Sequence, residues 1–348
     1  MTSPTRLDPG HDADAVVDAA TRLADGQLVA FPTETVYGLG ARADDDAAVA
    51  RIFQAKGRPS NHPLIVHVPD ALAASVFAAA VPPTAQRLME RFWPGPLTVI
   101  VPRNPALGAA AAGGQDTIGL RCPDHPVALA LLRAAAEQGV PGVAAPSANR
   151  FGRVSPTRAE HVMSEFADDD LWVLDGGPCA VGIESAIVDC SRGHPMLLRP
   201  GALSRDALEA AVGEPIGWSR PEAPDPNAPR ASGTLLAHYA PRAKVRLLSE
   251  AEILSALDKL MPAVVTSAAL HAVPQVAVYS RSAWAHRPVQ PGVVMRVMPA
   301  QPGAAAHDLF ADLRDMDALG VTQIWVETPP SDAAWDGVRD RLMRAAAA

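Results

Sequence analysis

The chain has 348 residues, of which 48% are hydrophobic and 20% charged, and its formal net charge is -8 at pH 7. This length exceeds what one hydrophobic core usually serves, so a globular protein with two domains is predicted. The negative net charge argues against a broad nucleic-acid-binding surface but leaves room for a local basic pocket that binds a small anion. No apolar run reaches the roughly 18 residues that a membrane span needs.

The three cysteines lie far apart in the sequence, at Cys122, Cys179 and Cys190, and form no CxxC pair. The sequence therefore contains neither a zinc motif nor a disulfide framework. The first residues lack the basic and apolar regions of a signal peptide. We expect a cytoplasmic protein whose cysteines are reduced and buried.

Helices and strands interleave in the first part of the chain without strict alternation. Helical spacing of apolar residues, and short apolar runs between Gly or Pro, distinguish the two types of element. The predicted helices are residues 12–26, 44–57, 70–81, 83–93, 125–139 and 204–213. The predicted strands are residues 27–33, 63–68, 96–102, 117–123, 142–149, 171–177, 184–190 and 195–201. This pattern predicts an α/β domain with an open, twisted, mixed sheet at residues 12–210.

A proline-rich segment follows the first domain, and residues 211–243 are interpreted as an extended linker. From residue 244 to residue 348, strands and helices alternate, which predicts a small Rossmann-like α/β domain. The strands expected there are 244–248, 263–268, 276–280, 293–298 and 322–328, and the helices are 250–260, 304–320 and 332–346. No GxGxxG follows a strand, so no nucleotide site is predicted in this domain.

The segment FPTETVYGLG, at residues 31–40, places two Thr, a Glu and a Tyr between a strand and a glycine-rich turn. Its hydroxyl and amide groups are suited to a small polar ligand, and Gly38 and Gly40 permit a close approach or a positive φ. An ordinary turn at the end of a strand explains the same pattern, and the residues alone leave both interpretations open.

Positive charge gathers in KGRPSNHPLIVHV, at residues 56–68, where Lys56 and Arg58 flank a glycine. An arginine fork and a lysine point charge beside a turn can hold a polyphosphate, although cations are also drawn to any helix C-terminus. His62 and His67 are five residues apart with Pro63 between them, which excludes a helical metal-binding pair. His67 is either a core histidine or a ligand-binding imidazole.

Further polar groups follow at the ends of predicted strands. Arg121 ends one of them in an apolar context, where an arginine usually has an anionic partner, either structural or a substrate carboxylate. The segment APSANRFGRVSPT, at residues 145–157, is rich in hydroxyl and amide groups. The segments GIESAIVDC and LLRPG add Ser185 and Arg199. No GxSxG, HExxH, Walker A or kinase motif is present, which argues against a nucleophile-driven hydrolase or a P-loop enzyme.

Together, FPTETVYGLG, KGRPSNHPLIVHV, FWPGPLT, IGLRCPDHP, APSANRFGRVSPT, GIESAIVD and LLRPG occur in an order that resembles the threonylcarbamoyl-AMP synthase family. The core of that family is called the YrdC-like domain. The resemblance covers roughly residues 12–203 and continues through SGTLLAHYAP, as in the longer, two-domain form of the family. Each motif alone has little specificity, but their joint order is highly specific.

The resemblance implies that L-threonine, bicarbonate and ATP are converted to L-threonylcarbamoyl-adenylate and pyrophosphate. Partner proteins, the downstream tRNA-modifying transferases, would use this product to form threonylcarbamoyladenosine in some tRNAs. The implied fold is an open, twisted sheet with a positively charged cavity. Magnesium is expected to be bound to the phosphates of ATP, and no set of protein side chains is expected to bind a metal.

The resemblance also assigns residues to the two substrates. Threonine is expected to contact Thr35, His67, Arg121, Ala145 and Ser185. ATP is expected to contact Lys56, Arg58, His62, Thr117, Ser147, Asn149, Ser155 and Arg199, and Lys56 and Arg58 are expected to be catalytic. Tyr239 is expected to close over the nucleotide, which would make residues 211–243 a tethered lid that excludes water from a labile adenylate.

Three other functions remain open at this point. An RNA-binding or ribosome-assembly module could use the basic cavity, although aromatic residues, at 5%, are few for base stacking. A related enzyme that transfers a carbamoyl group to a protein thiol would carry acylphosphatase and zinc-finger segments, which are not visible here. The C-terminal domain could also act purely as an interaction platform.

Overall fold

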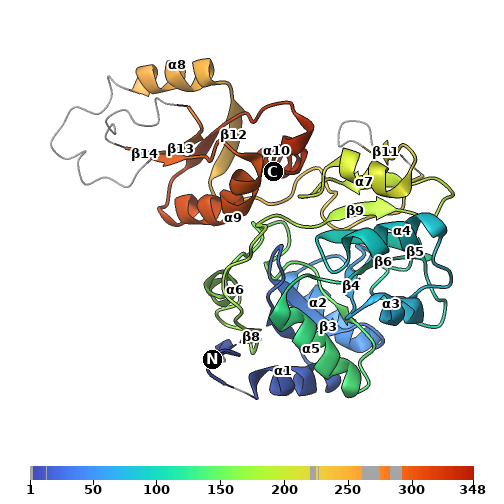
Figure 1. Cartoon of the computed structure of the whole chain (residues 1–348). Coiled ribbons are helices and arrows are strands. Elements are labelled where there is room, and N and C mark those ends of the chain that lie inside the picture. The colour runs from blue at the N-terminus through green and yellow to red at the C-terminus, as the bar shows by residue number, and fades with distance from the viewer. Residues whose placement is uncertain (1–2, 13, 220–224, 226, 261–274, 283–291) are drawn as a thin grey trace. The chain divides into compact units, whose positions relative to one another are not determined.

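The computed structural model describes residues 3–12, 14–219, 225, 227–260, 275–282 and 292–348. Its backbone contacts divide the chain into two compact units (Figure 1). Unit 1 comprises residues 1–151 and 155–234, and unit 2 comprises residues 152–154 and 235–348. Among the described residues, no helix is both long and apolar enough to cross a membrane.

Unit 1 is built on a mixed sheet, which confirms the predicted fold class. Within the described residues, its eleven strands run in the order β1-β8-β2-β3-β7-β4-β6-β5-β9-β10-β11. Their bounds are β1 Thr5–Leu7, β2 Val29–Phe31, β3 Gly38–Arg42, β4 Ile65–His67, β5 Leu97–Pro102, β6 Thr117–Arg121, β7 Val143–Ala144, β8 Trp172–Leu174, β9 Ala186–Asp189, β10 Met196–Arg199 and β11 Gly217–Trp218. The predicted pair of strands around residues 184–201 is confirmed as the antiparallel pair β9 and β10.

The glycine-rich turn predicted at residues 38–40 is wrong, because these residues open strand β3. This strand pairs antiparallel with both β2 and β7. A Cβ atom on Gly40 would lie 2.9 Å from side-chain atoms of Phe31 and of Val143, which is too close for any other residue. The glycine therefore serves close packing at the centre of the sheet, and its φ is not positive.

Seven helices of unit 1 are described, and they form two hydrophobic clusters with the sheet. Their bounds are α1 Ala15–Ala24, α2 Asp46–Lys56, α3 Ala71–Phe77, α4 Pro83–Phe92, α5 Pro126–Glu137, α6 Ala159–Glu165 and α7 Arg205–Val212. Along β2, Val29 and Phe31 belong to the cluster of α1 and α5, whereas Ala30 belongs to the cluster of α2, α4 and α7. This alternation follows from the two-residue period of a strand.

Another part of the sheet is covered by chain rather than by a helix. Residues 227–234, which we call the strap, follow β11 and belong to unit 1. Ala228 and Ala231 of the strap pack against the apolar cluster of Ile65, Ile100 and Ile187. The segment that composition predicted as a linker therefore includes residues that pack on the sheet of unit 1.

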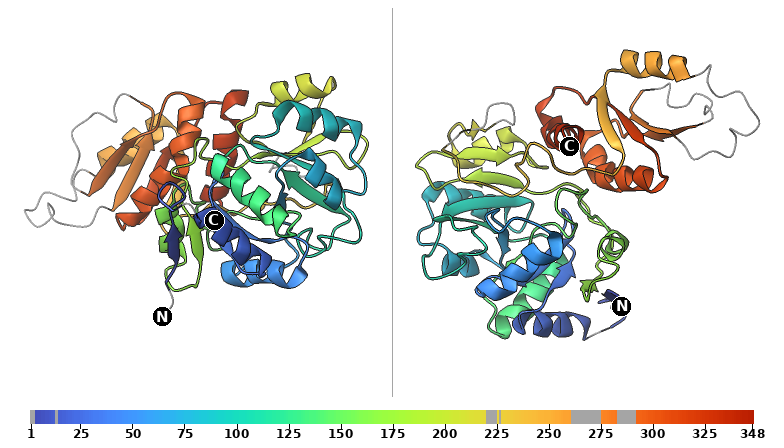
Figure 2. Two further views of the ribbon diagram at one scale, coloured as in Figure 1. Left: turned by 60° about the horizontal axis from the view of Figure 1, so that its bottom comes forward. Right: turned by 180° about the vertical axis from the view of Figure 1, so that it is seen from behind.

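Unit 2 contains a parallel sheet, as the alternating pattern predicted. Within the described residues its four strands run in the order β12-β15-β13-β14. The elements of unit 2 are the orange to red ribbons in Figure 2. The bounds are β12 Lys244–Leu248, β13 Val276–Ser280, β14 Val293–Val297, β15 Gln323–Glu327, α8 Glu250–Leu260, α9 Pro302–Ala318, η4 Ala333–Trp335 and α10 Asp336–Ala346. The strand predicted at residues 263–268 lies outside the described residues.

A buried network of charges lies inside unit 2, on helix α10. Asp340 accepts hydrogen bonds from Arg341 at 2.8 Å and from Arg344 at 2.8 and 3.0 Å, and all three side chains are buried. Arg344 also donates to the backbone oxygen of Leu235 at 2.5 Å. The guanidinium of Arg341 lies 5.5 Å from the ring centroid of Tyr239. Helix α10 thus anchors the start of unit 2 through a carboxylate shared by two arginines.

Candidate active site

The two cations predicted from KGR lie at the end of helix α2. Asp45 caps the start of the helix, where its side chain accepts hydrogen bonds from the amides of Ala47 and Ala48, and Gly57 caps its end in the left-handed conformation, with φ 63°. Lys56 Nζ donates to the backbone oxygen of Ser147 at 2.6 Å and also to that of Asn149. The lysine of KGRPSNHPLIVHV is therefore hydrogen-bonded directly to the backbone of APSANRFGRVSPT.

Lys56 carries its amino group in a buried environment, with 3% of the residue exposed. Burial, and next the positive charge of Arg58, hold the pKa of Lys56 well below its ordinary value. A buried ammonium group gains most from a nearby anion, because an anion offsets both effects. The end of α2 is thus suited to receive a negatively charged ligand.

Arg58 and His62 share one aromatic neighbour. The guanidinium of Arg58 lies 5.9 Å from the ring centroid of Phe151, and the ring of His62 meets the same phenyl ring edge-on at 5.6 Å. Arg58 Nη2 also donates to the backbone oxygen of Pro63 at 2.9 Å and to Ser232 Oγ of the strap at 3.4 Å. These contacts fix the arginine fork between β4 and the strap.

Arg199 approaches the strap from strand β10. Its Nη1 donates to the backbone oxygen of Ser232 at 2.8 Å, and its Nε and Nη2 donate to the backbone oxygen of Ser185 at 3.1 and 2.9 Å. Ser185 Oγ lies 2.8 Å from Thr98 Oγ1. Arg58 and Arg199 therefore converge on the same strap residue, although they come from distant parts of the sequence.

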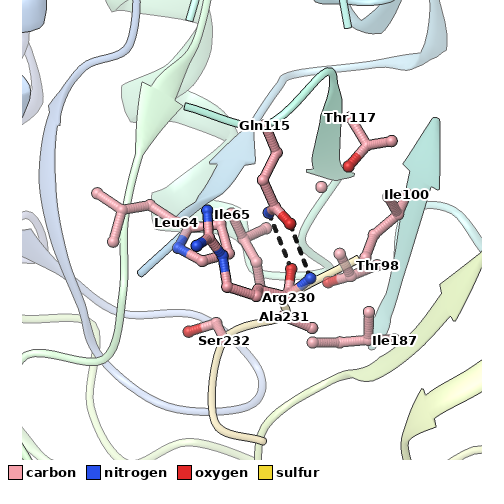
Figure 3. Close-up of a pocket in the computed structure, with 12 residues that line it drawn as sticks. Leu64, Ile65, Thr98, Ile100, Gln115, Thr117, Ile187, Arg230, Ala231 and Ser232 are labelled. Atoms are coloured by element: carbon pink, nitrogen blue, oxygen red, sulfur yellow. Dashed lines mark hydrogen bonds between the residues drawn. The ribbon is translucent and has the colours of Figure 1, made fainter. Parts of the chain in front are cut away.

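A cleft lies between the strap and the strands β4, β5, β6 and β9 (Figure 3). The space inside it, about 280 Å³, includes open solvent at its mouth. Gln115 joins its two sides, accepting from Arg230 N at 2.8 Å and donating to Arg230 O at 3.1 Å. The lining residues are Pro63, Leu64, Ile65, Thr98, Ile100, Gln115, Thr117, Gly119, Ile187, Arg230, Ala231 and Ser232. The walls are mainly apolar, and of the residues predicted to contact ATP the lining includes Thr117.

A second group of predicted residues gathers where β4 and β6 end. These strands are parallel, and His67 is paired in register with Arg121. Arg121 Nη2 lies 2.7 Å from Glu34 Oε1 in a buried ion pair. Thr35 Oγ1 lies 2.8 Å from Thr33 Oγ1 in the β2–β3 connection. The arginine thus has an anionic partner inside the protein, as an apolar strand end predicted, and that partner is Glu34.

Ala145 and Ser155, the remaining predicted residues of unit 1, are also buried. The amide of Ala145 donates to the backbone oxygen of Ile65 at 2.9 Å, which places it beside β4. Ser155 Oγ donates to the carboxylate of Glu184. Both contacts hold the segment after β7 against the two groups described above.

Tyr239 belongs to unit 2. Its ring is buried and stacks on Phe310 with 5.4 Å between the centroids, and its φ of 61° lies in the left-handed region, which is rare for a residue other than glycine. Its expected role over the nucleotide, like the lid function of residues 211–243, stays a prediction.

Five residues of these groups were absent from the residues predicted to form the site: Glu34, Thr98, Phe151, Glu184 and Ser232. Each lies inside or beside a quoted motif, so motif position would have been a usable signal for Glu34 and Glu184. Thr98 and Ser232 are identified by their contacts with Ser185 and with the two arginines. Such contacts depend on strand order, which the local sequence pattern does not specify.

Magnesium was expected to be bound to ATP rather than to the protein. Among the described residues, no group of three or more His, Cys, Asp or Glu lies close enough together to hold a metal ion. The carboxylate of Glu184 and the hydroxyl of Ser155 are oxygen donors of the kind that magnesium prefers. These two oxygen atoms could contribute to an ion that enters with ATP, and the magnesium expectation stays a prediction.

The acid stability of the protein should depend on His67. Burial, and next the charge of Arg121, lower the pKa of His67 to about 3. In the unfolded chain a histidine takes up its proton near pH 6.5. The folded state therefore loses stability as the pH falls from about 6.5 toward 3. In His67→Gln, the free energy of unfolding should fall less steeply over this window, by up to about 1.4 kcal/mol per pH unit.

Urea unfolding of wild type and His67→Gln at several pH values between 3.5 and 7.5 measures this difference in slope. His194→Gln, which removes an exposed histidine of unit 1, is the matched control. Equal slopes for wild type and His67→Gln would contradict a buried, neutral His67.

Comparison with known proteins relates this geometry to a family. A family model described as "Telomere recombination" matches residues 21–201, and one described as "Threonylcarbamoyl-AMP synthase, C-terminal domain" matches residues 203–347. The chain is 44% identical over 233 residues to the threonylcarbamoyl-AMP synthase of Bacillus subtilis, which covers 67% of this chain and 66% of that protein, just under two thirds of its length. It is 32% identical over 377 residues to the threonylcarbamoyl-AMP synthase of Schizosaccharomyces pombe, with 98% and 90% covered.

Solved structures agree with these matches. The crystal structure of P. abyssi Sua5 complexed with L-threonine matches with a TM-score of 0.86 and 33% identity, covering 99% of this chain and 98% of that chain. The crystal structure of E. coli YciO, at 22% identity and a TM-score of 0.51, shares the fold over 60% of this chain. The matches and the mixed sheet define a two-part protein in which a YrdC-like unit precedes a second α/β domain. The chain belongs to the threonylcarbamoyl-AMP synthase family.

Proposed function

We propose that the chain is an L-threonylcarbamoyladenylate synthase, which converts L-threonine, bicarbonate and ATP to threonylcarbamoyl-AMP and pyrophosphate. The observation that carries this proposal is the convergence of Arg58 and Arg199 on Ser232 at the cleft, with Lys56 buried nearby. Three cations around one site match the charge of a triphosphate. The printed names of the relatives support the same reaction.

The nucleotide is proposed to bind along the strap. The apolar walls around Ile65, Ile100 and Ile187 suit the nucleoside, while Lys56 and Arg58 suit the phosphates. Arg58 presents a planar fork that can bind two phosphate oxygens at once, and Lys56 acts as a compact charge. Both would stabilise the charge that develops as pyrophosphate leaves.

Threonine is proposed to bind at the ends of β4 and β6. Arg121 is the expected partner of its carboxylate, and Ser185 lies next to Thr98 on the path toward the cleft. The threonine amine and bicarbonate form a carbamate, and a carbamate oxygen then attacks the α-phosphorus of ATP. Because the nucleophile comes from the substrates, this chemistry needs positioning and charge stabilisation rather than an enzymatic nucleophile.

The proposal also includes a metal ion, a cellular compartment and partner proteins. Magnesium would enter with ATP and neutralise phosphate charge, and Glu184 and Ser155, which are hydrogen-bonded to each other, would offer protein oxygens to it. We place the reaction in the cytoplasm, where tRNA-modifying transferases would take up the labile adenylate. The strap would help to exclude water from it, as residues 230–232 already border the cleft.

Pyrophosphate release is the test of this function. Wild-type protein is mixed with ATP, magnesium and bicarbonate, and with L-threonine, L-serine or no amino acid. Release should require both threonine and bicarbonate. Serine should be poorer by roughly 10- to 200-fold, because one methyl group is worth about 1–3 kcal/mol. A folded protein that releases no pyrophosphate in response to threonine would contradict the proposed function.

A further inference from the structure

Glu34 is a buried carboxylate that the proposed chemistry has not yet used. It lies in the connection between β2 and β3, and 5% of the residue is exposed. In the described part of the chain, neither of its carboxylate oxygens accepts a hydrogen bond. The contact with Arg121 is thus an ion pair without an aligned hydrogen bond, although Oε1 and Nη2 are 2.7 Å apart. A buried carboxylate normally accepts several hydrogen bonds, so Glu34 has acceptor capacity to spare.

Stability alone gives a poor reason for this pair. Removing two charges from water is costly, and a buried ion pair offsets that cost only when further hydrogen bonds satisfy the remaining groups. Here Arg121 Nη2 and both oxygens of Glu34 lack such hydrogen bonds among the described residues. Arg121 Nε makes one long hydrogen bond, 3.4 Å, to the backbone oxygen of Gly95. The guanidinium of Arg121 and the carboxylate of Glu34 thus lie side by side with unused hydrogen-bonding capacity. Two such opposite charges are suited to bind a zwitterion.

We propose that Glu34 binds the α-ammonium group of the amino-acid substrate while Arg121 binds its α-carboxylate, a step that rests on the proposed function. The two groups of an α-amino acid are attached to the same carbon atom, so the protein charges that bind them must be neighbours. A substrate carboxylate alone would leave Arg121 facing two anions. Glu34 beside the ammonium keeps the buried site neutral overall.

Glu34 also accepts the proton that the amine must lose before it can react. The first step transfers one proton from the ammonium (R–NH3+) to the carboxylate, giving R–NH2 and a neutral carboxyl group. The free amine then forms a C–N bond with the carbon of bicarbonate, giving R–NH–COO− and water. Atoms and charge balance in both steps, and no other co-reactant is needed.

The other titratable groups around Glu34 are poorer acceptors for this proton. Burial raises the pKa of the Cys179 thiol far above its ordinary value and that of Cys122 to about 11, so both thiols are already protonated at neutral pH. Burial lowers the pKa of His125, which makes it a weaker base than an ordinary histidine. The guanidinium of Arg121 offers hydrogen-bond donors and no acceptor. Among these neighbours, Glu34 is the carboxyl group that lies in a buried ion pair with Arg121.

The test compares two ligands in Glu34→Gln and in wild type. The ligands are L-threonine and (2S,3R)-2,3-dihydroxybutanoate, in which a hydroxyl replaces the ammonium, and affinity is measured by calorimetry without ATP. Wild type should prefer threonine by about 10- to 100-fold, because a hydrogen bond to a charged group is worth that much. Glu34→Gln should bind both ligands with similar affinity. If Glu34 merely holds Arg121 in place, both affinities fall together and the preference remains, which would overturn the proposal.

Turnover provides the second measurement. Glu34→Asp keeps a base and should retain pyrophosphate release within about tenfold, whereas Glu34→Gln should lose about 100-fold or more, as expected for a general base. Thermal unfolding and ATP-analogue binding show whether each variant is folded. Equal release by wild type and Glu34→Gln would refute the inference. If wild type itself releases no pyrophosphate, the proposed function fails, while the two-ligand comparison still tests Glu34.

Discussion

Arg58→Ala is expected to reduce threonine-dependent pyrophosphate release by at least about a thousandfold, the range found for arginines that stabilise phosphoryl-transfer transition states. The physical reason is the loss of a fork that lies between β4 and the strap, with bonds to Pro63 and Ser232. Arg58→Lys should recover little, because lysine keeps the charge but cannot bind two phosphate oxygens in one plane. Steady-state release at saturating threonine measures the effect.

Two controls separate chemistry from folding in this experiment. Arg87→Ala removes an arginine from the exposed side of helix α4 in unit 1, where it lies 3.7 Å from Glu214, and should leave release unchanged. Threonine binding by Arg58→Ala, measured without ATP, should match wild type. Unchanged pyrophosphate release by Arg58→Ala would contradict a role for this arginine in the reaction.

Asp340→Asn is expected to destabilise unit 2 by about 3–5 kcal/mol, the usual result of breaking a buried ion pair by removing one partner. The carboxylate lies between Arg341 and Arg344, and all three groups are almost completely buried. Without its negative charge, two guanidinium groups repel each other in a medium that screens charge poorly. Because Arg344 also binds the backbone of Leu235, the segment that carries Tyr239 should loosen with the network.

Chemical unfolding followed by amide hydrogen exchange in strand β15 and helix α10, both in unit 2, measures this loss. Asp315→Ala is the control within the same unit, because it removes an exposed ion pair with Arg296. Such surface pairs are worth about 0–1 kcal/mol. If Asp340→Asn were as stable as Asp315→Ala, the buried network would not be what holds helix α10 in place.

Local patterns in the sequence predicted much of the fold. Periodicity and Gly or Pro boundaries located the long helices and the apolar strands, and the change of pattern at Lys244 indicated the parallel sheet of unit 2. The short elements β1, β3, α6 and β11 were missed, since two to seven residues give too little periodicity. Strand β3 was hidden by glycines, which resemble a turn locally but serve close packing of three strands in the folded protein.

The sequence motifs predicted which residues belong to the candidate site, but not all of the contacts between them. Lys56 and Ser147, from two separate motifs, do meet, as the joint resemblance implied. The partner of Arg121 could not be predicted from the sequence. Glu34 follows β2 and Arg121 ends β6, and the strand order that brings them together cannot be predicted from local sequence patterns. The same holds for the strap, since proline-rich composition indicates an extended chain but not the surface on which it lies.

The three cysteines have a practical consequence. All are free thiols and buried, and burial raises the pKa of Cys190, like those of Cys122 and Cys179, well above its ordinary value. Because the thiolate is the reactive form, alkylating reagents have no ready target in the native protein. A cysteine introduced at Leu236, which is 67% exposed, would then accept a fluorescent label at a single position, three residues from Tyr239. The wild-type sequence therefore allows labelling experiments that follow the segment between the strap and Tyr239 during turnover.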